Sequence, residues 1–174
     1  MENTKGISSD TVITGAEQLV SESDYIQLSC LVIEAVRRID SGHADTYHEL
    51  FTEDGELIIP ATIDNGKVVV PETILRGHNA IYEWGRSLIE AHPFGTIRHV
   101  CGNMRFVSVG PNEAEGITVL TVFMNPGTGV GTTLPWNVGE DHDRFVRTEH
   151  GWRLAARRWV SLFARPEPAQ RSNQ

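Results

Sequence analysis

Residues 34–60 read EAVRRIDSGHADTYHELFTEDGELIIP, and this stretch predicts the order of the first elements of the fold. Its apolar positions Val36 and Ile39 continue a helical stripe that Asp40-Ser41-Gly42 ends. A short helix is predicted around 44–51, and Glu53-Asp54-Gly55 predicts a turn after it. Residues 56–63 then read as a strand, which contains Pro60 and is therefore expected at a sheet edge.

The segment before this stretch predicts a long helix that begins near residue 21. Ser21 or Ser23 can cap its first turn, and Asp24 suits the positive end of the helix. One side carries apolar residues at helical spacing: Tyr25, Leu28, Val32, Val36 and Ile39. A third helix is expected over 78–91, and its apolar residues also lie on one side: Ile81, Trp84, Leu88 and Ile89.

The pattern changes to a β type after residue 92. Long strands are expected over 96–109, 115–124, 137–148 and 152–163, in addition to a short strand over 67–70. Turns such as Gly110-Pro111-Asn112 and His150-Gly151 separate successive strands, which predicts antiparallel pairing. Helices followed by such a run of strands predict an α+β fold.

Length and charge limit the classes of function. The chain has 174 residues, which suits one domain, expected over 22–165. Residues 1–21 and 166–174 are polar and aperiodic, so we expect a flexible arm and a flexible tail. The formal net charge of −8 argues against nucleic acid or an anionic membrane as a partner.

The cellular compartment is predicted from the few cysteines and from the lack of long apolar segments. Its two cysteines, Cys30 and Cys101, make no disulfide framework. The N-terminus lacks the apolar core of a signal peptide, and apolar runs fall short of the roughly 20 residues of a membrane span. We therefore expect a cytoplasmic protein that does not enter the membrane.

Four segments resemble a known family. The stretch 34–60, LRGHNAI (75–81), IRHVCGNMRFV (97–107) and DRFVRTEHGWRLAARRW (143–159) are similar, in this order, to motifs of the SnoaL-like branch of the nuclear transport factor 2-like superfamily. The resemblance covers roughly residues 22–163. It implies a cone-shaped α+β barrel in which three N-terminal helices pack on a strongly curved antiparallel or mixed sheet that encloses a pocket. This fold hosts dehydratases, isomerases, cyclases, epoxide hydrolases and non-enzymatic subunits.

Asp40 and His99 are the first candidates for chemistry. Asp40 closes a helix at the end that disfavours negative charge, which suggests a use elsewhere. Strand parity places Ile97, His99, Cys101 and Asn103 on one face. The residues alone also allow a plain interpretation, with His99 as a core histidine and Asp40 as a helix end. Resemblance to SnoaL-like dehydratases and related eliminating enzymes implies a dyad in which Asp40 orients His99, the general base, because imidazole titrates near neutrality.

Arg157 is the third candidate catalytic residue. Adjacent Arg157 and Arg158 point to opposite faces, so one of them can face the interior. Related eliminating enzymes carry an arginine five residues after the tryptophan of the last hairpin, as Arg157 follows Trp152, and such an arginine would stabilise a developing anion. The alternative is an ion pair with Asp141 or Asp143.

A further set of residues is predicted to bind substrate. Parity places Trp159, Ser161 and Phe163 with Arg157, and the two rings would form flat walls for a cyclic substrate. The remaining substrate-binding candidates are polar or amphipathic: Asn103, Cys101, Asp141 and Tyr47. Ile39 precedes Asp40, so the chain lacks the Tyr-Asp pair that scytalone dehydratase shows at this helix end.

No metal or cofactor is expected. The run Glu140-Asp141-His142-Asp143 places only two side chains on each face, short of the three or four ligands of a zinc site, and parity does not decide which face is inward. Glycine-rich nucleotide motifs and a Gly-x-Ser-x-Gly elbow are missing from the sequence. A Cys101–His99 nucleophilic pair is disfavoured because neighbours two apart on a strand point in parallel.

The sequence therefore predicts a cofactor-independent lyase or isomerase, of a dehydratase or polyketide cyclase type found in secondary metabolism or catabolism. Its substrate would be a small apolar cyclic molecule from which His99 removes a proton. The alternative is a non-catalytic protein of the same fold: the small subunit of an aromatic-ring-hydroxylating dioxygenase, or a ligand-binding module. In each case we expect a homodimer or homotrimer, because the open sheet face of this fold is usually paired.

Overall fold

The computed structural model describes residues 18–64, 67–91, 97–125 and 135–163. Within these ranges, three helices and eight strands follow one another in this order: α1 (Glu22–Asp40), η1 (Ala44–Leu50), β1 (Phe51–Ile59), β2 (Thr62–Asp64), β3 (Lys67–Val70), β4 (Thr73–Arg76), α2 (Gly77–Ala91), β5 (Ile97–Gly110), β6 (Glu113–Met124), β7 (Pro135–Thr148) and β8 (Gly151–Ser161).

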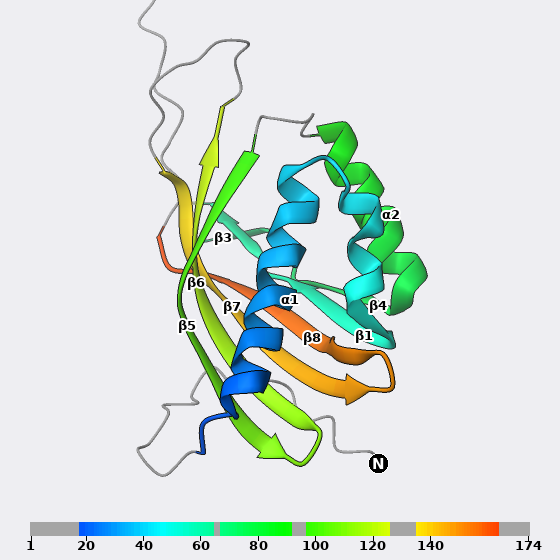
Figure 1. Ribbon diagram of the computed structural model, residues 1–174. Helices are drawn as coiled ribbons and strands as arrows, with labels where there is room; N and C mark the ends of the chain where they lie inside the picture. Colours follow the sequence, from blue (N-terminus) through cyan, green and yellow to red (C-terminus); the bar gives the residue numbers. More distant parts are fainter. Residues whose placement is uncertain (1–17, 65–66, 92–96, 126–134, 164–174) are drawn as a thin grey trace, which may run out of the picture.

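The six-stranded sheet is mostly antiparallel, with the order β4-β1-β8-β7-β6-β5. Among the described strands only the β1–β8 pair is parallel, and β2 pairs with β3 in a separate two-stranded sheet. Figure 1 shows α1, η1 and α2 on the same side of the large sheet. The α+β prediction is confirmed, but the sheet is open between its edges β4 and β5, so the described strands do not close the expected barrel.

Two predictions about the order of elements are wrong. The third helix, α2, follows β1 to β4, so the helices are not all N-terminal. The strand with Pro60 is not an edge, because β1 lies between β4 and β8 and ends one residue before the proline. The expected turn at 53–55 is instead an irregularity within β1, where the register with β8 shifts between Phe51 and Glu56.

Both ends of α1 are attached to the sheet by carboxylates. Ser21 Oγ accepts a hydrogen bond from the backbone N–H of Asp24 and caps the helix. Asp24 Oδ1 accepts hydrogen bonds from Trp152 Nε1, at 3.0 Å, and from Arg147. Hydrogen bonding, with that from Trp152 the strongest, lowers the pKa of Asp24. At the other end, Asp40 binds β5, and the helix is therefore oriented over the sheet.

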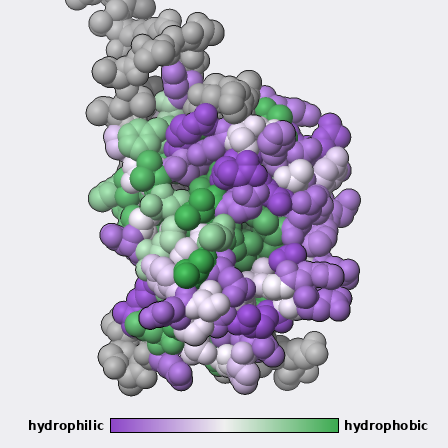
Figure 2. Space-filling model, in the orientation of Figure 1, coloured by the Kyte–Doolittle hydropathy of each residue, from purple (hydrophilic) through white to green (hydrophobic). Residues whose placement is uncertain are grey.

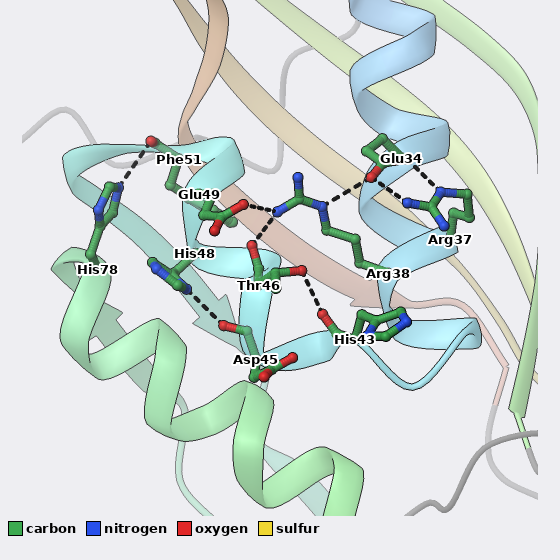
Figure 3. Close-up of polar contacts among 10 residues, drawn as sticks. All are labelled: Glu34, Arg37, Arg38, His43, Asp45, Thr46, His48, Glu49, Phe51 and His78. Atoms are coloured by element: carbon green, nitrogen blue, oxygen red, sulfur yellow. Dashed lines mark hydrogen bonds and ion pairs between the residues drawn. The ribbon is translucent and has the colours of Figure 1, made fainter.

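The short helix η1 is held between α1 and α2 by side-chain contacts (Figure 3). Arg38 of α1 donates hydrogen bonds to Glu34, to Glu49 and to the carbonyl of Thr46. On the other side, the ring of His48 contacts that of His78 edge to face at 5.3 Å. These contacts place η1 so that Tyr47 is buried against the sheet.

The core lies between the helices and one end of the sheet. Leu28 and Val32 of the predicted stripe are fully buried, as is Ala35 beside them, although Tyr25 of the stripe is 43% exposed. They pack with buried aromatic and aliphatic residues from the strands: Phe51, Phe106, Phe145, Trp152 and Leu154. Figure 2 shows hydrophilic residues over the side of α2 and more hydrophobic residues toward the side of β5.

The structure describes only part of the arm and tail that the sequence predicts at the two ends of the domain. Residues 1–17 of the expected arm and the whole expected tail, 166–174, lie outside the described residues. Residues 18–20, which the sequence assigns to the arm, lie along β5, where Ser108 N–H donates to the carbonyl of Gln18 at 2.8 Å. No helix in the described ranges is both long and apolar enough to cross a membrane.

Gly85 permits the close approach of α2 to η1, and this predicts a large effect of substitution. A Cβ atom at Gly85 would lie 2.0 Å from the carbonyl oxygen of Ala44, which is backbone and cannot rotate away. Gly85→Ala should therefore lower the free energy of unfolding by about 1–3 kcal/mol, measured by urea denaturation. Gly102→Ala is the matched control, because beyond its two chain neighbours no atom of the described residues lies within 4 Å of the added methyl group. Equal stabilities of the two variants would contradict this packing.

Candidate active site

The strand register collects polar side chains on the face of the sheet beneath the helices. Alternate residues of β6 and β7 are buried there, which resolves the parity left open by the sequence: Asp141 and Asp143 face inward. The register pairs Thr118 with Asp141 and Asp141 with Trp159, and it pairs Asp143 with Arg157. Polar groups from three neighbouring strands therefore lie side by side next to the aromatic core.

A β-bulge turns Arg157 inward. Phe145 pairs with Leu154, but Arg144 pairs with Ala156, so the register skips Ala155. Strict alternation from Leu154 would have placed Arg157 on the outer face, and the extra residue reverses this. Arg157 is only 2% exposed, whereas Arg158 points outward and pairs with Glu72.

The Arg157 guanidinium is paired on several sides. Its Nε and Nη2 donate to the two carboxylate oxygens of Asp143 at 2.7 and 2.6 Å. Its Nη1 donates to the Tyr47 hydroxyl at 3.1 Å and lies 3.3 Å from Asp141 Oδ2. Burial opposes the charge of Arg157, but Asp141 and Asp143 outweigh it and raise the pKa of this group. The ion pair that the sequence analysis weighed as the alternative is therefore present, with both aspartates.

Asp141 differs from Asp143 in how it is held. Asp141 is 5% exposed, and within the described ranges the ion pair with Arg157 is the one polar contact of its carboxylate. Burial raises the pKa of Asp141 to about 6, since the attraction of Arg157 is partly offset by the repulsion of Asp143. Burial likewise raises the pKa of Tyr47 to about 12, so its hydroxyl stays protonated.

Asp40 and His99 contact each other, as the resemblance implies. Asp40 Oδ1 lies 2.7 Å from His99 Nδ1, and Asp40 Oδ2 accepts a hydrogen bond from the His99 backbone N–H at 2.9 Å. The two side chains are 16% and 12% exposed. An ionised Asp40 assigns the ring proton to Nδ1, so Nε2 is left with its lone pair and has no partner among the described residues.

Cys101 and Trp159 lie on the inner face. Burial raises the pKa of Cys101 to about 11, so it is a thiol rather than a nucleophilic thiolate near neutrality. A Cβ atom at Gly139 would lie 2.6 Å from Cζ2 of Trp159, so the indole covers this glycine. Ser161 Oγ lies 3.0 Å from Asn137 Oδ1 at the exposed end of β8.

Two predicted positions do not face the interior. Asn103 has φ of 48° and is exposed, at a register shift between Gly102 and Arg105. This bulge interrupts the alternation on which its placement with His99 rested, so that parity prediction is wrong. Phe163 follows the end of β8 and is 62% exposed, which corrects its expected place beside Arg157.

The sequence analysis missed Thr118. This residue is fully buried, and its hydroxyl has no hydrogen-bond partner among the described residues. Only the pairing register of β6 with β7 reveals that it lies opposite Asp141. His142 and Glu140 contact each other at 2.8 Å on the outer face, and in the described ranges no three potential ligands form a metal site.

Comparisons with known proteins place this geometry in a family. The sequence model of the SnoaL-like domain matches residues 23–158. No curated protein matches the chain. Similar solved structures share the fold at low identity, and the three described next come from Novosphingobium aromaticivorans.

The first of these structures is a protein like nuclear transport factor 2 with a cystatin-like fold: 23% identity, TM-score 0.63, covering 80% of this chain and 82% of that one. The second is a candidate scytalone dehydratase, which is 16% identical in sequence with a TM-score of 0.63. The match covers 86% of this chain and 95% of that one. The third is the beta subunit of a candidate aromatic-ring-hydroxylating dioxygenase, which is 20% identical in sequence with a TM-score of 0.64. The match covers 79% of this chain and 88% of that one.

The raised pKa of Asp141 predicts how stability depends on pH. The folded state binds this proton more tightly than the unfolded chain, so protonation stabilises fully below about pH 4 and the benefit is lost as pH rises through about 6. Asp141→Asn should therefore be more stable than the wild type above pH 6, by on the order of 2 kcal/mol, and the gain should vanish below pH 4.

Urea denaturation between pH 4 and pH 8 measures this difference. Asp143→Asn is the contrasting variant, because it removes the bidentate partner of a buried guanidinium and should cost about 3–5 kcal/mol at neutral pH. An Asp141→Asn protein that is less stable than the wild type at pH 7.5 would show that the carboxylate stabilises the fold.

Proposed function

The chain belongs to the SnoaL-like domain family of the nuclear transport factor 2-like superfamily, and we propose that it is a cofactor-independent lyase or isomerase of small, largely apolar cyclic molecules. The observation that carries this proposal is the contact between Asp40 and His99. Membership of the family alone does not select a reaction, because the same fold supports enzymes and non-enzymatic proteins.

In the proposed reaction His99 is the general base. Its Nε2 accepts a proton from a substrate carbon next to a carbonyl group, and Asp40 stabilises the imidazolium through Nδ1. The second bond from Asp40, to the His99 backbone, fixes the carboxylate relative to the strand as well as to the ring. The ring therefore cannot turn its protonated nitrogen toward the substrate without breaking this contact.

The surrounding groups suit an apolar ring that acquires negative charge. Trp159 and Tyr47 provide aromatic surface beside the polar cluster. Arg157 supplies positive charge in a site of low exposure, where electrostatic interactions are strong. Because Asp143, Asp141 and Tyr47 already engage its guanidinium, we assign Arg157 an electrostatic role on the developing anion.

The second candidate function is a non-catalytic subunit or ligand-binding module. The observation that favours it is the structural similarity to the beta subunit of a candidate dioxygenase. In that case the contact between Asp40 and His99 would only tie α1 to β5. We prefer the enzyme, and we propose that it assembles as a homodimer or homotrimer without a second type of chain.

This preference predicts the behaviour of the protein expressed alone. It should be soluble and elute as a uniform dimer or trimer, measured by size-exclusion chromatography with light scattering. A subunit that depends on a catalytic partner should instead aggregate, because the surface that the partner covers would be left exposed. Insolubility that co-expression of a dioxygenase large subunit reverses would favour the second candidate.

The proposed proton abstraction can be measured without the natural substrate. The probe is 3-hydroxycyclohexanone, whose C2 protons exchange for deuterium in D₂O, followed by NMR after subtraction of the buffer rate. His99→Ala should lower the exchange rate by at least about 100-fold, since it removes the base. Asp40→Asn should lower it by about 10- to 1,000-fold, since the ring loses the partner that orients it.

The matched control is His150→Ala, at an exposed position in the turn between β7 and β8, and it should leave the exchange rate unchanged. Circular dichroism and thermal unfolding of each variant separate a loss of chemistry from a loss of fold. Exchange at the wild-type rate in a folded His99→Ala protein would refute the proposed function.

A further inference from the structure

The interior holds two aspartates that the structure treats differently. Asp143 uses both carboxylate oxygens in short hydrogen bonds to Arg157. Asp141, two residues away on the same face of β7, contacts Arg157 through one oxygen at 3.3 Å. One aspartate therefore neutralises the buried guanidinium, and the other has hydrogen-bonding capacity to spare.

The neighbour of Asp141 on β6 is a polar residue whose side chain has no hydrogen-bond partner in the described structure. Thr118 lies directly opposite Asp141, is fully buried, and has an unpartnered hydroxyl within the described structure. A buried hydroxyl without a hydrogen bond costs about 1–3 kcal/mol, so the Thr118 hydroxyl beside the Asp141 carboxyl requires an explanation. Trp159 lies opposite Asp141 on the other neighbouring strand, β8. A ligand oxygen beside Trp159 would satisfy both groups.

The charged groups around Asp141 come from several elements. Arg157 lies on β8, Asp143 on β7 itself, and His99 on β5, and each of them acts on the Asp141 carboxyl. His142, on the outer face of β7, has a weaker effect on the pKa of Asp141. The Tyr47 hydroxyl of η1 accepts a hydrogen bond from Arg157 Nη1, the nitrogen that also contacts Asp141. Burial dominates these influences and raises the pKa of Asp141 to about 6, so this carboxyl can carry a proton near neutrality and release it.

We propose that Asp141 is the general acid of this site and protonates a hydroxyl group that leaves the substrate as water. The inference rests on the proposed function, since it requires the proton abstraction by His99, and it narrows the reaction to dehydration. The substrate class is then a cyclic β-hydroxy ketone, or a related ring compound with an acidic C–H bond next to the carbon that bears the hydroxyl.

The proposed step is balanced without any co-reactant. The C–H bond breaks, its proton goes to His99 Nε2, and its electron pair forms the new C=C bond. The C–O bond breaks with its electron pair on oxygen, which takes the proton of Asp141 and departs as water. Afterwards His99 releases a proton and Asp141 takes one up, so both groups return to their starting forms. Thr118 orients the hydroxyl group by a hydrogen bond.

The same probe separates the two roles because it has two readouts. With 3-hydroxycyclohexanone, deuterium exchange at C2 reports the base, and the absorbance of 2-cyclohexenone reports loss of water. Asp141→Asn should retain exchange within about threefold but lower enone formation by at least about 100-fold, because an amide cannot supply the proton. His99→Ala should abolish both, and Glu140→Gln, a carboxylate-to-amide change on the outer face of β7, should affect neither.

The experiment distinguishes a failure of the Asp141 assignment from a failure of the proposed function. Enone formation that Asp141→Asn leaves unchanged overturns the role of Asp141 alone, whereas exchange that His99→Ala leaves unchanged overturns the proposed function. If the wild type forms no enone above the buffer rate, NMR of protein labelled with ¹³C in the aspartate carboxyl groups decides. A resonance missing in Asp141→Asn that titrates between pH 5 and 7 supports the assignment, and one that titrates near pH 4 overturns it.

Discussion

The burial of Arg157 is the constraint on which the rest of the interior depends. A guanidinium cannot lose its proton in a protein, so a buried one must be surrounded by acceptors. Asp143 supplies two, and Asp141 and Tyr47 complete the set from β7 and η1. This requirement links the last hairpin of the sheet to the short helix, and it explains why polar residues occupy a face that is elsewhere apolar.

The second constraint is the attachment of α1 to β5 through Asp40 and His99. Asp24 holds the first turn of the helix, and Asp40 holds its last. The described interior contains the carboxylates of Asp40, Asp141 and Asp143. The guanidinium of Arg157 cannot neutralise all of them. Burial in this interior raises the pKa of Asp141 to about 6, and the repulsion of Asp143 adds to this effect, so the carboxyl can exchange a proton near neutrality.

Local sequence signals predicted the elements better than their order in the sheet. The stripe of α1, the cap at Ser21 and the four long strands are all present. The signals failed at Pro60, because a proline one residue beyond a strand says nothing about which strands flank it. They also failed at Asn103, because a bulge is a property of two paired strands, and one strand read alone shows only its alternation.

The sequence by itself determined the family, the α+β class and the two residues Asp40 and His99 as candidates, because motifs, helical periodicity and caps are encoded within short segments. The tertiary structure alone decided which faces meet. It turned Arg157 inward through the skipped Ala155, set Thr118 opposite Asp141 and separated the roles of Asp141 and Asp143. The physical reason is that register and bulges depend on neighbouring strands, and a shift of one residue exchanges the inner face of a strand for the outer one.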